Sequence, residues 1–161
     1  MRRAVTFLFA LLAIAALGPA AAQPARETPY WASIASGRAM MRSGPGQNYP
    51  GQWLYVRADL PIRVVEVYQS WRKVEDPDGT QGWMLVSLLS GTRTALVRGR
   101  APAAMHESAD ASSAVQFRAA PGVVGRISRC ASGWCHFDVG GRAGYIRTDH
   151  LWGVGRDEAV S

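Results

Sequence analysis

Both cysteines of the chain lie in one short segment, CASGWCH, at residues 130–136. Cys130, Cys135 and His136 therefore place two thiols and an imidazole close together in the chain. Such a set can bind a metal, attach haem, carry out thiol–disulfide exchange or close a hairpin with a disulfide. The compartment in which the chain folds and the element that carries the segment decide among these.

The N-terminus predicts export. A basic pair at positions 2–3 precedes the apolar run VTFLFALLAIAAL, and small residues follow up to Ala22. This order is typical of a secretory signal peptide, here residues 1–22. A membrane span needs about 20 apolar residues, and a Gly-Pro pair interrupts this run before that length. We expect a periplasmic protein without a transmembrane segment after cleavage, with secretion as the alternative.

Charge and compartment bear on the partners. The formal net charge is +6 and falls to +4 when the signal peptide with its two arginines is removed. The remaining arginines are spread along the chain, whereas nucleic-acid binding requires a dense basic face. We therefore expect no nucleic-acid partner. In an oxidising compartment, two cysteines usually form a disulfide.

An all-β fold is predicted after a leader at 23–30. Short runs rich in Val, Ile, Trp and Tyr alternate with Gly, Pro and Asp, and no stretch keeps helical periodicity. Short strands at roughly ten-residue spacing are typical of small barrels or sandwiches. The expected strands are 39–42, 53–57, 62–68, 71–75, 82–86, part of 97–105, 115–118, 124–129, 134–139 and 143–146.

An internal repeat divides the chain. Residues 70–91 align with residues 133–153, and VRADLP at 56–61 echoes FRAAP at 117–121. The alignment matches Trp71 with Trp134, Val74 with Phe137, Gly82 with Gly144, Trp83 with Tyr145, Leu89 with Leu151 and Gly91 with Gly153. We predict a first copy at 31–91, a second copy at 94–154 and a tail at 155–161. The short connection predicts that the copies touch, and the repeated aromatic residues are expected mostly in the barrel cores.

The first copy resembles a known family. RSGPGQNYP at 42–50, followed by the DPDG turn and a Gly-Trp pair, is similar to bacterial SH3 domains. The second copy, with Cys130, Trp134-Cys135 and a terminal LWGV, resembles the exported tandem form found in proteobacteria. The resemblance covers about 31–154. It implies two tandem SH3-like small β-barrels packed against each other, acting as a non-catalytic binding module for peptidoglycan, its peptide or another envelope component.

The alternatives for CASGWCH differ in what they need. Haem attachment uses the spacing CxxCH, which CASGWCH does not have. A zinc site needs four ligands, and His106 and His150 are the only other histidines in the sequence. On a strand, Cys135 and His136 point to opposite faces, which argues against a catalytic pair. Opposed Cα atoms of antiparallel strands lie about 4.5–5.5 Å apart, within disulfide reach. We predict a Cys130–Cys135 disulfide and neither cofactor nor metal.

The predicted ligand site lies beside the Gly-Pro-Gly turn and comprises Arg42, Tyr49, Trp53 and Tyr55. Aromatic rings can stack on a sugar or peptide, and a guanidinium can bind a carboxylate. In the second copy, HESADASS replaces this loop, and the three aromatic residues are expected to lack counterparts. No enzyme signature is present, so no catalytic residue is predicted. The alternatives are a scaffolding protein that binds another envelope protein through its sheet edges and, third, a cell-wall-associated enzyme.

Overall fold

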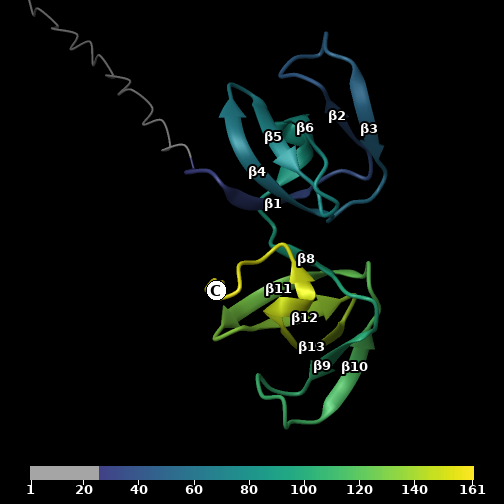
Figure 1. The fold of residues 1–161 in the computed structure, drawn as a ribbon, viewed down its shortest axis with the longest axis vertical. Helices are drawn as coiled ribbons and strands as arrows, with labels where there is room; N and C mark the ends of the chain where they lie inside the picture. Colours follow the sequence, from purple (N-terminus) through teal and green to yellow (C-terminus); the bar gives the residue numbers. More distant parts are fainter. Residues whose placement is uncertain (1–25) are drawn as a thin grey trace, which may run out of the picture.

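The structure is a computed structural model that describes residues 26–161, so the predicted signal peptide lies outside the described residues. The described chain is built from strands and two single-turn 3-10 helices (Figure 1). In order, they are β1 (Tyr30–Ile34), β2 (Ala39–Arg42), β3 (Gly51–Tyr55), β4 (Pro61–Tyr68), β5 (Trp71–Glu75), β6 (Gln81–Leu85), η1 (Val86–Leu88), β7 (Leu89–Ser90), β8 (Thr94–Val97), β9 (Ala103–His106), β10 (Val115–Ala119), β11 (Val124–Ala131), β12 (Trp134–Val139), β13 (Arg142–Arg147), η2 (Thr148–His150) and β14 (Leu151–Trp152). No helix among residues 26–161 has the length and hydropathy to cross a membrane.

The two copies have the same strand order. The first sheet runs β3-β2-β6-β5-β4-β1-β7, and the second runs β10-β9-β13-β12-β11-β8-β14. Position for position these orders are equivalent, so the predicted all-β fold with two SH3-like repeats is confirmed. Strands β1, β7 and β14 were not predicted, because β1 follows a polar leader and the other two are only two residues long. β8 was missed as well, since it shares only Val97 with the strand expected within 97–105.

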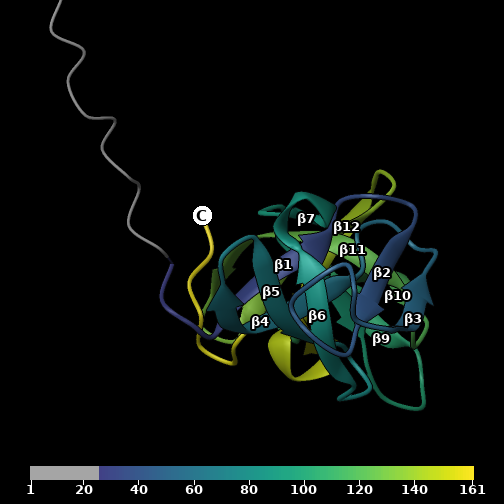
Figure 2. The same cartoon turned by 90° about the horizontal axis from the view of Figure 1, so that it is seen from above.

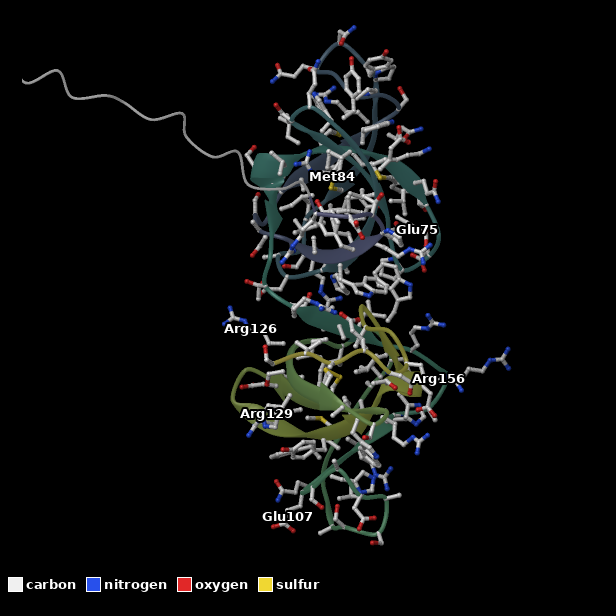
Figure 3. The ribbon with its side chains drawn as sticks, turned by 90° about the vertical axis from the view of Figure 1, so that its left-hand side faces the viewer. Glu75, Met84, Glu107, Arg126, Arg129 and Arg156 are labelled. Atoms are coloured by element: carbon white, nitrogen blue, oxygen red, sulfur yellow. A yellow bond between two sulfur atoms is a disulfide. The ribbon has the colours of Figure 1, made fainter. Side chains whose placement is uncertain are left out.

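Each sheet curls around its own core. In the first copy, Ile34, Met41, Val64 and Met84 are fully buried, and Figure 3 shows Met84 inside this sheet. The core of the second copy contains Met105, Phe137 and Ile146, whose side chains are at most 2% exposed. Burying alternate residues of a strand on one face is what the hydrophobic pattern of these strands requires.

The two cores balance large and small residues differently. Val74 of the first copy corresponds to Phe137 of the second, and Ile62 corresponds to Gly125, by the strand registers. A Cβ on Gly125 would lie 2.7 Å from the Phe137 ring. The glycine therefore makes room for the larger ring, while the first copy fills the same space with an isoleucine and a valine.

The repeated aromatic residues do not all lie in the cores, which corrects the prediction. Trp71 and Trp134 are each 8% exposed, yet neither belongs to a core cluster. Trp83 and Tyr145 are partly exposed, since their neighbours Met84 and Ile146 on the same strands point inward. Strand alternation puts these aromatic residues on the outer face of each sheet.

The predicted disulfide is confirmed. Cys130 and Cys135 are bonded, with 2.06 Å between the sulfur atoms, across the hairpin of β11 and β12. Ala131 pairs with Trp134, so the turn itself is Ser132-Gly133, and both turn residues have positive φ. The C-terminal segment also meets this hairpin, because the backbones of Cys130 and Val160 exchange hydrogen bonds of 2.9 and 3.2 Å.

The copies touch, as predicted. Trp31 of the first copy and Trp152 of the second pack edge to face, with ring centroids 4.9 Å apart. Leu96 and Val124 of the second copy pack against the core of the first. The copies are stacked along the long axis (Figure 1), so that the first sheet covers the second when seen from above (Figure 2).

Candidate functional site

The β2–β3 hairpin divides the predicted site between two faces. Trp53 pairs with Met41 and Tyr55 with Ala39, and both partners are core residues. Residues that oppose each other in an antiparallel pair share a face, so Trp53 and Tyr55 lie on the core side of the hairpin. Arg42 lies on the other face. It pairs with Trp83, which is on the outer side of β6.

Arg42 and Tyr49 are brought together. The Arg42 Nη1 donates a hydrogen bond of 2.7 Å to the Tyr49 carbonyl oxygen, which orients the guanidinium. The Tyr49 ring lies against the Gly-Pro-Gly turn so closely that a Cβ on Gly44 would overlap it. The turn therefore needs glycine because an aromatic ring covers it, and the loop holds Arg42 in place.

A groove of about 380 Å³ runs over this outer face. Met40 and Leu54 form an opposed pair within it, and Trp71 from β5 contributes a ring that is almost fully buried. The groove, which we call the outer groove, is lined by Arg38, Met40, Arg42, Gln47, Leu54, Trp71, Leu85 and Leu88. Its lining contains two guanidinium groups and no carboxylate.

Tyr55 stabilises the first copy rather than lying free for a ligand. Its hydroxyl donates a hydrogen bond of 2.7 Å to Asp76 Oδ2, and its ring packs against the first core. Burial, followed by the bond to Asp76, raises the pKa of Tyr55 strongly. The other Asp76 oxygen accepts the backbone N–H groups of Asp78 and Thr80, which closes the turn between β5 and β6. Trp53, in contrast, is 59% exposed.

The strand registers also identify the counterparts in the second copy. Phe117 pairs with Met105 as Trp53 pairs with Met41, and Ala119 pairs with Ala103 as Tyr55 pairs with Ala39. The expectation that Trp53 lacks an aromatic counterpart is therefore wrong. The echo of 56–61 in 117–121 aligned residues that are not equivalent. It matched Phe117 with Val56, whereas the registers match Phe117 with Trp53.

The outer face of the second copy has a different chemistry. The rings of His106 and Trp134 meet edge to face with centroids 5.5 Å apart, and the Arg147 guanidinium lies 5.7 Å from the Trp134 centroid. His136 packs in the same way on Tyr145, which Arg129 covers. Burial, and next the charge of Arg129, lower the pKa of His136. Cationic side chains thus cover the aromatic rings of this face, where the first copy has the outer groove.

Metal ligands do not gather in the part of the chain that the structure describes. Residues 26–161 contain no group of three or more His, Cys, Asp or Glu side chains placed to hold a metal ion. Within that range, the outer groove presents an aromatic ring, aliphatic side chains and guanidinium groups.

Comparison with known proteins identifies the family. The bacterial SH3 domain family matches residues 35–91 and residues 99–153, which together make up more than half of the chain. The chain belongs to the bacterial SH3 domain family. Each copy is thus one bacterial SH3 domain, and the outer groove lies on the first SH3 domain. No curated protein matches the chain.

Solved structures with similarity to this tandem of SH3 domains include two from Trichomonas vaginalis. NlpC2 is 13% identical with a TM-score of 0.34, and the match covers 80% of this chain and 49% of that one. NlpC1 is 12% identical with a TM-score of 0.34, covering 80% of this chain and 47% of that one. The tandem spans about half the length of the solved structures that it matches.

Proposed function

We propose that the protein is an exported, non-catalytic binding module of the cell envelope. In this proposal the outer groove of the first SH3 domain binds peptidoglycan through its peptide, in the periplasm. The observation that carries the proposal is the lining of the groove, which combines aliphatic and aromatic side chains with two arginines and no acid.

The groove suits a peptide that carries carboxylates. Met40, Leu54 and Leu85 offer an apolar surface for the peptide backbone and small side chains. Arg42 is oriented by Tyr49, so less conformational entropy is lost when its guanidinium pairs with a carboxylate. A cell-wall peptide presents both features, apolar methyl groups and free carboxylates, in an extended chain.

Two features support the proposed location. The N-terminal sequence has the order of charge, apolar run and small residues of a secretory signal. The Cys130–Cys135 disulfide is stable in an oxidising compartment such as the periplasm and is unusual in the cytosol.

Sedimentation with purified sacculi tests the proposal. The mature protein should sediment with sacculi, and Arg42→Ala should reduce the bound fraction about tenfold, because a charge-assisted bond contributes about 1.5–3 kcal/mol. Leu54→Glu should have a similar effect, since it places a negative charge in the groove. Trp53→Ala is the matched control, because Trp53 neighbours Leu54 on β3 but faces the other side. Loss of binding in the control, with normal binding by Arg42→Ala, would contradict the proposal.

The edge strand β3 favours a second candidate, a scaffold that pairs with another envelope protein. β3 ends the first sheet, and Trp53, Leu54 and Val56 beside this edge are 59%, 41% and 68% exposed. An exposed edge can pair with a strand from a partner. In that case sacculi stripped of protein would not bind the module, whereas untreated envelopes would.

A further inference from the structure

The second SH3 domain has a cleft on the core side of its β9–β10 hairpin. Its volume is about 440 Å³, within the range of small-molecule pockets. We call it the Ala119 cleft; it is lined by Met105, Phe117, Arg118, Ala119, Ala120, Val123, Val139 and Arg142. It lies on the core side of the β9–β10 hairpin, because Phe117 is the pairing partner of buried Met105.

The cleft arises from a paired replacement. In the first domain the equivalent space is filled by the Tyr55 ring, whose hydroxyl is bonded to Asp76. The registers make Ala119 the counterpart of Tyr55, and Val139 that of Asp76. Both members of the buried polar pair are thus replaced by apolar residues, and the space comes from the loss of the tyrosine ring at Ala119. The space left has an apolar wall that matches an aromatic or branched aliphatic group rather than a phenol.

The rim of the cleft is positively charged. Arg118 and Arg142 are both exposed, and the lining includes no carboxylate. Within residues 26–161, neither guanidinium forms an ion pair. An arginine at the mouth of an apolar cleft provides the donors for a planar carboxylate.

We propose that the Ala119 cleft binds the C-terminal residue of a peptide, with an aromatic or branched aliphatic side chain inside and its carboxylate at Arg142, which shares the cleft face with its pairing partner Val139. The ring of the ligand takes the place that Tyr55 occupies in the first domain, and Phe117, which is 37% exposed, packs against it. This site is separate from the outer groove and needs no change in the strands.

N-acetyl-L-phenylalanine is the probe, and its neutral amide is the matched comparison. Titrated into the labelled mature protein, the acid should shift the backbone NMR signals of Phe117, Ala119 and Val139, with a dissociation constant of about 1 mM. The amide should bind about tenfold more weakly, because it lacks the charged acceptor. Signals of Arg42 and Leu54 report on the outer groove, so this result is independent of the sacculus experiment.

The variant Ala119→Tyr/Val139→Asp fills the cleft with the pair that the first domain already accommodates. It should keep its melting temperature within a few degrees and lose acid binding. Should that variant fail to fold, Arg142→Gln is the charge variant and should bind acid and amide equally. Arg118→Gln is its matched control, because Arg118 pairs with Ala104 on the outer face of the hairpin. The proposal is overturned if the acid causes no shifts in the cleft, if the filled variant binds normally, or if the charge variant still prefers the acid. Protein dimerisation that itself shifts the cleft signals would also overturn it, since a second copy would then be the occupant.

Discussion

The two SH3 domains differ on both faces of their sheets. On the core side, the first domain buries Tyr55 against Asp76, whereas the second has Ala119 and Val139. On the outer side, the first domain has the outer groove, whereas the second has Arg147 stacked on Trp134. The strands beneath these positions nevertheless have the same order. The comparison shows that pairing and strand order withstand large changes on either face of the β-sheet. Binding surfaces on this fold can therefore diverge while the framework stays the same.

The most sensitive difference between the domains is the exchange of Ile62 and Val74 for Gly125 and Phe137. Gly125→Ile should lower the free energy of unfolding by about 3 kcal/mol, because a Cβ there lies 2.6 Å from the Asp138 carbonyl oxygen and 2.7 Å from the Phe137 ring. Adding Phe137→Val should recover part of this loss, since it recreates the first-domain combination. Denaturant titration of both variants measures the effect. An unchanged midpoint for Gly125→Ile would show that the two cores are packed more loosely than the structure indicates.

The disulfide marks a second asymmetry, since only the second domain has one. Replacing both Cys130 and Cys135 by Ser should destabilise the protein by about 2 kcal/mol, as expected for a short closed loop. Calorimetry should show a lower melting temperature, while sacculus binding at low temperature should stay unchanged, because the outer groove is in the other domain. In the unaltered protein, alkylation without reductant should leave both cysteines unmodified. Native labelling of both thiols would contradict the disulfide.

The smallest expected effect concerns the C-terminal segment, which has no equivalent in the first domain. Burial opposes ionisation of Glu158, but hydrogen bonds from Arg93, at 2.6 Å, and from the Gly155 N–H outweigh it and lower its pKa. A lowered pKa stabilises the fold above the ordinary value of 4.5, and this contribution is lost as the pH falls through the folded value. Thermal melts between about pH 6 and pH 3 should show a shallower decline for Glu158→Gln, by less than about 1 kcal/mol.

Gly155→Ala is a useful comparison for that experiment, because it changes the segment but keeps the carboxylate. If Glu158→Gln and the unaltered protein lose stability in parallel on acidification, the Arg93–Glu158 pair does not hold the segment in place.

The repeat in the sequence predicted most of the strands and both domains, because tryptophan and glycine positions recur at matching places in the hairpins. Sequence comparison was weaker where a short similar string, VRADLP against FRAAP, stood in for strand register. It misaligned Phe117 and so missed that Trp53 has a counterpart. The Ala119 cleft also escaped notice, because an alanine and a valine carry no signal until their counterparts, Tyr55 and Asp76, are seen to touch. Separating Arg42 from Trp53 required the β2–β3 register, which pairs Trp53 with Met41.

The connection between the domains consists only of residues 91–93, and Trp31 packs on Trp152 beside it. The β2–β3 and β9–β10 hairpins therefore lie at opposite ends of the long axis, at a separation that neither domain can readily change (Figure 1). If the outer groove and the Ala119 cleft both bind, as we propose, the molecule discriminates by spacing. Ligands at the matching distance raise the effective concentration of the second contact, whereas ligands at other distances engage one end at a time.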